Sequence, residues 1–268
     1  MRIAALQVVS STDLDHNLQR ADALLDEAAR RGADLAVLPE YFCVMEQPGT
    51  SKTRFAEAPG SGPVQQMLAA AAARHRMWVV GGSLPLQCPE PDRVYNSTMA
   101  FGPDGTLVAR YDKMHLFAFE QGTERYAEGD TIAPGSAPAA FAAQGMRIGL
   151  SICYDLRFPE LYRALSTPAP CDAFLVPAAF TYTTGEKHWE VLLRARAIEN
   201  LAYVVASAQG GRHANGRRTW GHSMIIDPWG DVLTLLAEGE GVITADIEPE
   251  RIAARRASLP ALGHRRVF

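Results

Sequence analysis

The order of predicted elements repeats once along the chain, and this repeat constrains the fold more than any other feature of the sequence. Apolar runs and helical patterns follow one another as strand, helix, strand, helix, strand and hairpin from Ile3 onward, and the same order begins again at Arg147. The repetition is one of elements and not of residues. Two such halves are expected to combine into one architecture.

Four of the predicted strands are apolar at most positions: residues 3–9, 34–40, 148–152 and 173–177. Such strands need cover on both faces, and helices alternating with them cover only one face if two sheets face each other. We therefore predict an α/β fold in which the two halves stack sheet to sheet as a four-layer α-β-β-α sandwich. We expect residues 1–268 to form a single domain, with residues 112–143 crossing between the halves.

Three local signals refine this outline. Gly102-Pro-Asp-Gly105 lies between two strand patterns and predicts a hairpin. Thr183-Thr-Gly-Glu186 fits a capping box and predicts the start of a long helix. Residues 255–268 form an irregular tail with the apolar side chains Leu259, Val267 and Phe268, which we expect to pack either on a partner subunit or on their own domain.

Composition disfavours several classes of protein. The formal net charge of −4 gives no reason to expect nucleic acid or an anionic membrane as a partner. No apolar run approaches the ~20 residues of a membrane span, and the N-terminus is expected to be a core strand and not a signal peptide. The four cysteines are widely spaced and the seven histidines show no ligand spacing. We therefore expect no disulfide framework, no metal and no cofactor, and a cytoplasmic location.

Cys153 lies where a predicted strand turns into a predicted helix. Residues 148–152 form the strand, and Pro159 with Glu160 opens the helix. Main-chain N–H groups at the start of a helix favour a thiolate over a thiol, and the N–H of Tyr154 is placed to donate to an oxyanion. Cys153 is thus a candidate nucleophile. The alternative is an ordinary buried cysteine, because free cysteine is among the most buried residue types.

Glu40 and Lys113 are the candidate partners of this cysteine. Glu40 ends an apolar strand, as Cys153 does in the other half, so both are expected at the same edge of the sandwich. A carboxylate at the rim of a buried site serves as a base near neutrality, and an ammonium group stabilises an oxyanion. The alternative for both residues is a solvated loop position.

Three separated motifs resemble the signatures of the nitrilase, or carbon–nitrogen hydrolase, superfamily. They are Leu-Pro-Glu40, Tyr-Asp-Lys113-Met-His-Leu-Phe and Gly-Leu-Ser-Ile-Cys153-Tyr-Asp-Leu-Arg-Phe-Pro-Glu-Leu, in this order. The resemblance covers nearly the whole chain. It implies the α-β-β-α sandwich, a homodimer or larger homo-oligomer, and a Glu-Lys-Cys triad made of Glu40, Lys113 and Cys153.

Further stretches resemble the Nit-type amidases of this superfamily, namely residues 188–200 and 221–230. Gln209-Gly-Gly-Arg-His213 and the terminal His264-Arg-Arg266 are more similar to deaminated glutathione amidases than to omega-amidases. Glu120 resembles the second glutamate that many members place beside the triad, although Glu124 and Glu128 lie close to it in the sequence.

Basic side chains near the expected site indicate a negatively charged substrate. Arg157 lies four residues after Cys153, and the loop after a core strand carries three more arginines, Arg212, Arg217 and Arg218. Surface charges or internal ion pairs are the alternative for these. Phe180, Thr183 and Thr184 follow the strand that ends at Pro177 and are candidate walls of the pocket.

These observations together predict hydrolysis of the amide bond of a small anionic substrate through a thioester on Cys153, with release of ammonia. Omega-amidase, nitrilase and N-carbamoyl amide hydrolase activities are alternatives, because the triad chemistry is common to all of them. An inactive binding module is disfavoured by the intact triad. A metal-dependent amidohydrolase is disfavoured by the absence of ligand spacing.

Overall fold

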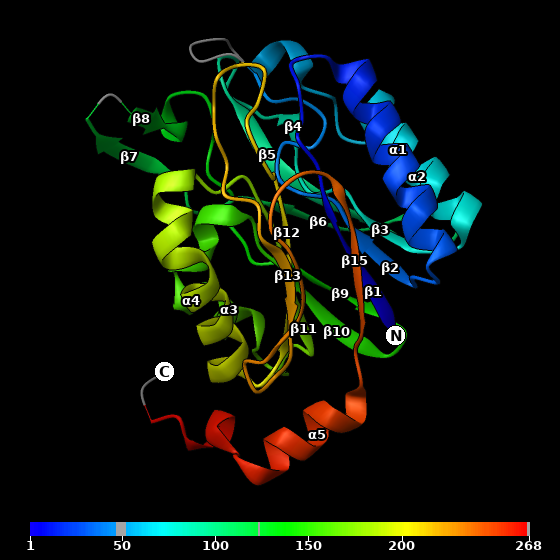
Figure 1. Ribbon diagram of the computed structural model, residues 1–268, viewed down its shortest axis with the longest axis vertical. Helices are drawn as coiled ribbons and strands as arrows, with labels where there is room; N and C mark the ends of the chain where they lie inside the picture. Colours follow the sequence, from blue (N-terminus) through cyan, green and yellow to red (C-terminus); the bar gives the residue numbers. More distant parts are fainter. Residues whose placement is uncertain (47–51, 123, 267–268) are drawn as a thin grey trace.

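The computed structural model describes residues 1–46, 52–122 and 124–266, and its strands form two large sheets that lie face to face (Figure 1). Helices α1 (Leu14–Arg30) and α2 (Pro63–His75) cover the outer face of one sheet. Helices α3 (Pro159–Leu165) and α4 (Tyr182–Asn200) cover the outer face of the other. The predicted four-layer α-β-β-α sandwich is confirmed.

Seven strands form the first sheet: β1 (Arg2–Gln7), β2 (Leu35–Val37), β3 (Trp78–Val80), β4 (Leu84–Gln87), β5 (Val94–Phe101), β6 (Leu107–Asp112) and β15 (Gly241–Asp246). Their order is β15-β1-β2-β3-β5-β4, with β6 also paired to β5. The pairs β1–β2 and β2–β3 are parallel, and the remaining pairs are antiparallel. The hairpin predicted around Gly102 to Gly105 is the β5–β6 connection.

Six strands form the second sheet: β9 (Ala140–Ala143), β10 (Met146–Leu150), β11 (Ala173–Ala178), β12 (Tyr203–Ala208), β13 (Ser223–Ile226) and β14 (Val232–Leu236). Their order is β14-β13-β12-β11-β10-β9. The central pairs β10–β11 and β11–β12 are parallel, as the central pairs of the first sheet are. The second sheet thus repeats the parallel centre of the first.

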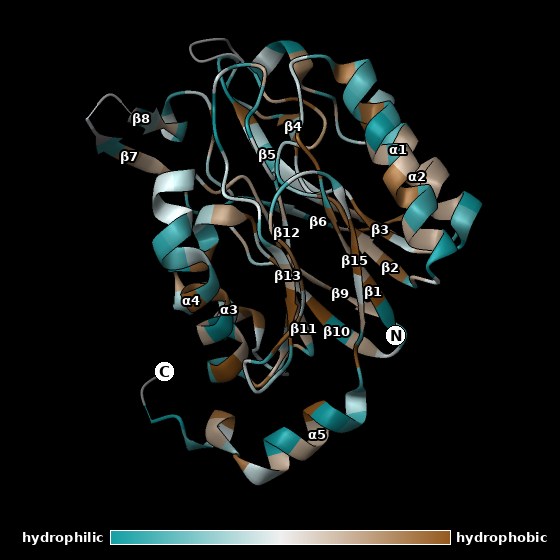
Figure 2. Cartoon of the chain, in the orientation of Figure 1, coloured by the Kyte–Doolittle hydropathy of each residue, from teal (hydrophilic) through white to brown (hydrophobic). Residues whose placement is uncertain are grey.

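Alternate residues of the central strands face different layers. In β1, Ile3 and Ala5 belong to the core between the sheets, whereas Ala4 and Leu6 belong to the core beneath α1 and α2. All four side chains are fully buried. Figure 2 shows the resulting pattern, with the central strands largely apolar and polar residues along the helices. Each buried aliphatic side chain contributes roughly 1.5–3 kcal/mol, and both faces of these strands contribute.

The carboxyl ends of several strands meet at one edge of the sandwich. β2 and β10 lie in different sheets, and the chain continues from them to Glu40 and to Cys153. β6 is antiparallel to β5, which is antiparallel to β3, so β6 runs in the direction of β3 and ends at the same edge. Lys113 follows β6 directly. The strand directions therefore place Glu40, Lys113 and Cys153 at the same edge of the sandwich.

Helix α4 begins earlier than predicted. Its N-cap is Thr181, which has an extended backbone conformation, and the helix starts at Tyr182. The hydroxyl groups of Thr181 and Thr184 share a hydrogen bond of 2.8 Å. The predicted capping box beginning at Thr183 is therefore wrong, because the chain is already helical there.

The C-terminal segment is more regular than predicted. Helix α5 (Pro249–Ser258) and a 3-10 helix, η4 (Ala261–His264), occupy most of it. The prediction of an irregular tail from residue 255 is therefore wrong for these positions. Arg256 fixes α5 on its own chain by donating to the carbonyl oxygens of Cys171 and Leu201. Val267 and Phe268 lie outside the described residues.

The remaining elements are short. They are the β7 (Ala118–Gln121) and β8 (Glu124–Ala127) hairpin and the 3-10 helices η1 (Lys52–Phe55), η2 (Glu128–Asp130) and η3 (Cys153–Arg157). None of the helices in the described ranges is long and apolar enough to cross a membrane.

Gly82 packs against the backbone of Leu38 and Pro39, at the end of the strand that leads to Glu40. Gly82 has φ +40°, and a Cβ atom there would lie 2.0 Å from the carbonyl oxygen of Pro39. Gly32 has φ +77° with no neighbouring atom within 4 Å of such a Cβ. We expect Gly82→Ala to lower the free energy of unfolding by more than about 3 kcal/mol, and Gly32→Ala by only about 1–2 kcal/mol. Urea denaturation of both variants measures this, and equal losses would contradict it.

Candidate active site

Glu40, Lys113 and Cys153 converge at the shared edge of the two sheets. Their side chains are almost completely buried, with Glu40 1% exposed, Lys113 0% and Cys153 8%. Charged groups are rarely buried to this extent unless they are paired. The structure thus brings together the three residues that the motifs predicted, although they are up to 113 positions apart in the sequence (153 − 40).

Glu40 is held by donors from three other segments. Its Oε1 accepts hydrogen bonds from Lys113 Nζ at 2.8 Å and from Asn96 Nδ2 at 2.9 Å. Its Oε2 accepts from the main-chain N–H of Ala179 at 2.9 Å. The charge of this carboxylate also raises the pKa of the Cys153 thiol. Glu40 is therefore fixed in orientation and close enough to the candidate nucleophile to act on it electrostatically.

Lys113 lies between two carboxylates. Its Nζ is 2.8 Å from Oε1 of Glu40 and 2.8 Å from Oε2 of Glu128. Burial alone would lower the pKa of Lys113, but the charges of Glu128 and Glu40 outweigh it and raise that pKa. The two carboxylates therefore favour the ammonium form of Lys113.

The second glutamate of the site is Glu128, and the prediction of Glu120 is wrong. Glu120 lies on β7 and is exposed, because the β7–β8 hairpin carries it away from the sheet edge. Glu128 opens η2 and accepts hydrogen bonds from Lys113 Nζ, Tyr41 Oη and the N–H of Phe117, each at 2.8 Å. Burial opposes its ionisation, yet Lys113 and Lys52 lower its pKa to about 2. Three glutamates within nine positions gave no sequence signal to separate them.

Cys153 occupies a strained turn. Its φ of 47° is left-handed, which is uncommon for a residue with a side chain and typical of nucleophiles on sharp strand-to-helix turns. The helix that follows directly is the short 3-10 helix η3, and α3 starts only at Pro159. The predicted strand-to-helix position is found, but with a different kind of helix.

The thiol of Cys153 keeps its proton in the resting protein. Burial raises its pKa well above the ordinary value, the charge of Glu40 adds to this rise, and Lys113 only partly opposes it. Burial and the charge of Glu40 thus oppose the preference for a thiolate that is expected at a helix start.

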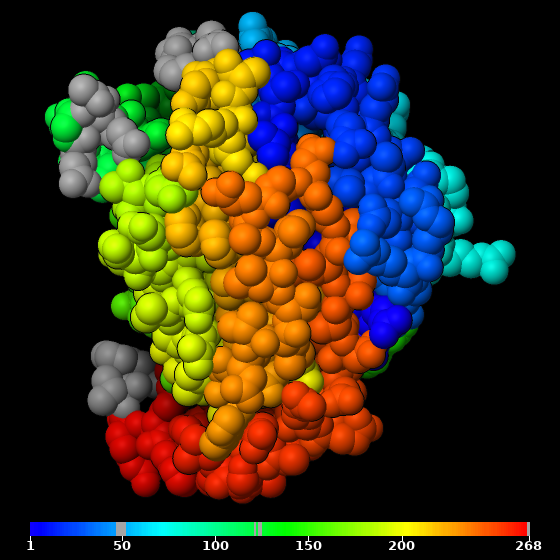
Figure 3. Space-filling model, viewed as in Figure 1, coloured from blue at the N-terminus to red at the C-terminus, as the bar shows by residue number. Residues whose placement is uncertain are grey.

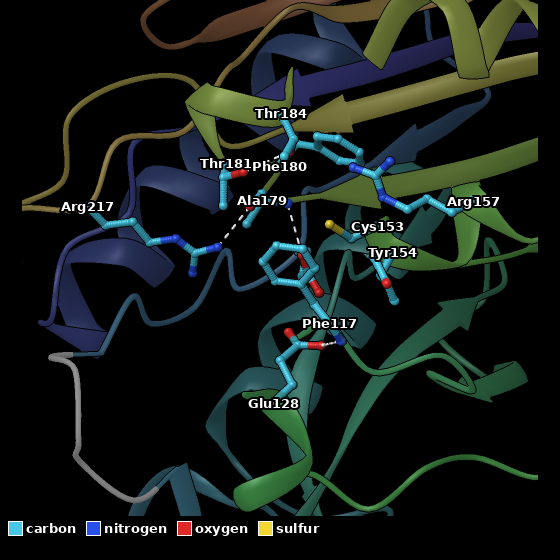
Figure 4. A pocket seen from close by; sticks show the side chains of 11 residues that line it. Phe117, Glu128, Cys153, Tyr154, Arg157, Ala179, Phe180, Thr181, Thr184 and Arg217 are labelled. Atoms are coloured by element: carbon cyan, nitrogen blue, oxygen red, sulfur yellow. Dashed lines mark hydrogen bonds between the residues drawn. The ribbon is translucent and has the colours of Figure 1, made fainter. Parts of the chain in front are cut away.

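A pocket opens above Cys153, and Figure 4 shows its walls. It is lined by these residues: Glu40, Phe117, Glu128, Cys153, Tyr154, Arg157, Ala179, Phe180, Thr181, Thr184 and Arg217. The predicted positions Tyr154, Arg157, Phe180 and Thr184 are among them. Thr183 is exposed and is not a wall, because the start of α4 turns it outward and places Thr181 in the pocket.

The four candidate arginines have different environments. Arg157 and Arg217 line the pocket. Arg212 is exposed, and Arg218 forms an ion pair with Glu238 and stacks on the ring of Tyr182. The sequence did not separate Arg217 from its neighbour Arg218. The roles of Asn96 and Ala179 as donors to Glu40 were also missed, because an interior strand residue and a main-chain N–H carry no motif.

Across the described ranges, no group of three or more His, Cys, Asp or Glu side chains is placed to hold a metal ion. All four cysteines are free, with Cys43, Cys153 and Cys171 buried and Cys88 partly exposed.

Comparison with known proteins identifies the class. Residues 2–257 match the carbon-nitrogen hydrolase family, and the chain belongs to this family. It is a hydrolase that acts on the carbon–nitrogen bond of amides.

Two relatives are similar over nearly their whole length. The deaminated glutathione amidase of Synechocystis is 42% identical over 266 residues, which cover 98% of this chain and 97% of that protein. The omega-amidase NIT2 of Danio rerio is 36% identical over 266 residues, which cover 99% and 94%. Among solved structures, the C. elegans NitFhit protein has a TM-score of 0.91 at 34% identity. The match covers 99% of this chain and 65% of the NitFhit chain, so this chain spans about two thirds of that protein.

The protonation state of Cys153 leads to a prediction about its reactivity. We expect alkylation of Cys153 by iodoacetamide to be slow at neutral pH and to accelerate up to and beyond the ordinary thiol pKa of ~8.5. Glu40→Gln removes a negative charge that raises the thiol pKa, so its rate profile is expected to shift to lower pH.

Peptide-level mass spectrometry across a pH series measures the rate at Cys153 alone. Cys43 and Cys171 are internal controls, since burial raises their pKa values to about 12 and about 11. A wild-type rate that has already reached its plateau at neutral pH would contradict the prediction.

Proposed function

We propose that this protein hydrolyses the amide bond of deaminated glutathione through a thioester on Cys153, with Glu40, Lys113 and Cys153 as the catalytic triad. The observation that carries this proposal is the placement at one pocket of a strained cysteine and a buried carboxylate that is ion-paired to an ammonium group. This is the set of groups that cysteine-dependent amide hydrolysis requires.

In the first half-reaction, Glu40 takes the proton of Cys153 as the sulfur attacks the amide carbon. The S–C bond forms, the carbonyl oxygen becomes an oxyanion, and the C–N bond breaks as Glu40 gives the proton to the departing nitrogen. An amine leaves poorly as an anion, so the base must also serve as the acid. Glu40 and Cys153 line the same pocket, and this placement supports both roles.

Lys113 is the proposed oxyanion donor. An ammonium group has three N–H donors, and two of them are engaged by Glu40 and Glu128. The third is available for the oxyanion, with the N–H of Tyr154 as the second proposed donor. Losing one such donor typically costs ~10²–10³ in rate. In the second half-reaction, Glu40 takes a proton from water as the water oxygen attacks the thioester carbon. The C–O bond forms, the S–C bond breaks, and Glu40 returns the proton to the sulfur of Cys153 as the acid is released.

Two observations support deaminated glutathione as the substrate: the similarity to amidases of that class and the two arginines in the pocket walls. Glutathione whose amino group has been replaced by an oxo group carries a carboxylate at each end, and the pocket has an arginine in two of its walls. Hydrolysis of its side-chain amide yields 2-oxoglutarate and cysteinylglycine, so the departing nitrogen belongs to a dipeptide and the release of ammonia expected from the sequence does not apply to this substrate. The alternative is omega-amidase action on alpha-ketoglutaramate, which yields 2-oxoglutarate and ammonia, and relatives of that class are also close.

The assay that tests this proposal measures 2-oxoglutarate, the product common to both substrates. We expect wild-type protein to prefer deaminated glutathione over alpha-ketoglutaramate in kcat/KM, and Cys153→Ala to lose turnover of both by at least ~10⁴-fold. Cys153 belongs to the buried core, so circular dichroism of Cys153→Ala checks that its loss of turnover is not a loss of folding. A preference for alpha-ketoglutaramate would make the protein an omega-amidase, and turnover by Cys153→Ala would exclude the thioester route.

We further propose that the protein is a homodimer or larger homo-oligomer that works in a reducing cytoplasm. Apolar side chains are exposed on α4 and around β14: Val191, Ile198, Trp229, Leu233 and Leu235. Figure 3 shows α4 (yellow-green) beside the orange segment that contains β14 on one face of the molecule. Exposed apolar surface of this kind marks protein interfaces. The segment that follows α5, with Leu259 43% exposed, is proposed to pack on the partner subunit.

Sedimentation velocity tests the proposed assembly. Val191 is 68% exposed on α4, and Val191→Asp is expected to lower the sedimenting mass to that of a monomer of 29.1 kDa, because a charge would be buried at the interface. Gln66→Asp introduces the same charge on the exposed face of α2 and is expected to change nothing. A wild-type monomer, or an effect of both variants, would contradict the proposal.

A further inference from the structure

We propose that Arg217 binds the carboxylate of the leaving group and thereby selects secondary amides whose amine part ends in a carboxylate over primary amides. This inference rests on the proposed function and assigns one end of the substrate to one side of the pocket. It concerns the amine part only, and not the acyl part that becomes the thioester.

Arg217 and Arg157 enter the pocket from opposite sides, with Cys153 between them (Figure 4). Arg157 lies 3.3 Å from Nδ1 of His188 and over the rings of Tyr154 and Phe180. Arg217 lies against Met45 and over the ring of Tyr126. The two guanidinium groups share no partner among these contacts, so they form two separate cationic positions.

Arg217 lies on the side of the pocket where the amine must leave. Its Nη2 donates to the carbonyl oxygen of Ala179 at 2.9 Å, and the N–H of the same residue donates to Oε2 of Glu40 at 2.9 Å. Glu40 must give its proton to the departing nitrogen, so that nitrogen lies against the Glu40 carboxylate. A group attached to the nitrogen therefore extends toward Ala179 and Arg217.

Arg217 also has unused capacity to bind an anion. Its Nε is buried without a hydrogen-bond partner, and Nη1 contacts only the weak acceptor Sδ of Met45, at 3.7 Å. Within the described part of the chain it forms no ion pair, whereas the neighbouring Arg218 is paired with Glu238. A guanidinium group with free donors in a pocket is suited to bind a carboxylate through two hydrogen bonds.

The local charge supports an anion at this position. Lys52 lies 4.8 Å from the centre of the Tyr41 ring, on the Glu128 side of the site. Burial lowers the pKa of Lys52, and repulsion from Arg217 and Lys113 lowers it further, while Glu128 and Glu40 oppose this. Lys113 is paired with Glu40 and Glu128, whereas Arg217 has no ion-pair partner among the described residues. A ligand carboxylate would supply the missing partner.

Substrate structure provides the experiment. The amine part of deaminated glutathione ends in the glycine carboxylate, its glycinamide analogue lacks that charge, and alpha-ketoglutaramate has no such part. We expect Arg217→Gln to lower kcat/KM for deaminated glutathione by about 10- to 100-fold, mostly through KM, as for a lost charge-assisted hydrogen bond. We expect at most a few-fold change for alpha-ketoglutaramate. Arg218→Gln is the matched control and is expected to leave all rates within about two-fold, because it lies in a surface ion pair.

The glycinamide analogue distinguishes binding of the glycine carboxylate by Arg217 from an indirect effect of Arg217 on the positions of Ala179 and Glu40. In wild type it should be about 10- to 100-fold poorer than the free acid, and in Arg217→Gln the two should be equally poor. Equal losses for deaminated glutathione and alpha-ketoglutaramate would show that Arg217 only positions Ala179 and Glu40, and would overturn the inference. A persisting preference of Arg217→Gln for the free acid would also overturn it. If wild type hydrolyses none of the three substrates, the proposed function itself fails.

Discussion

The buried ammonium group of Lys113, between the carboxylates of Glu40 and Glu128, is the interaction on which the site depends. Removing one member of such a group leaves an uncompensated buried charge, which costs about 3–5 kcal/mol. The charge of Glu40 also raises the pKa of the Cys153 thiol, and the same carboxylate is the proposed base. Asn96 and the N–H of Ala179 hold that carboxylate in place from both sheets. The site is therefore assembled from both halves of the chain.

The sandwich explains why these groups meet. Parallel central strands in each sheet send their carboxyl ends to one edge, and the chain leaves each strand through a residue that carries function. Position 82 requires glycine, because a side chain there would collide with the carbonyl oxygen of Pro39 and displace the chain that leads to Glu40. The left-handed backbone of Cys153 stores strain at the nucleophile, as backbone outliers at functional sites often do. A rigid scaffold thus presents one reactive thiol at the base of a pocket with cationic side chains in its walls.

Predictions from the sequence were most successful where periodicity or a motif was specific. The repeat of elements predicted the layers, because strands apolar on both faces require two layers of cover. The three motifs named Glu40, Lys113 and Cys153, which the structure places together. Glu128 was missed as the second glutamate because the β7–β8 hairpin, not spacing, decides which of three acids points inward. No local pattern indicated that burial and the charge of Glu40 raise the pKa of the Cys153 thiol.

By itself, the sequence determined the layer architecture, the family and the three central residues, since these follow from short-range patterns of polarity and from local motifs. Only the tertiary structure decided which side chains face the pocket and in what charge state. Thr181 and Arg217 line it while Thr183 and Arg218, one or two positions away, face outward. The start of α4 and the course of the loop after β12 set these orientations. The physical reason is that orientation and pKa depend on contacts between segments distant in the sequence, which no local pattern records.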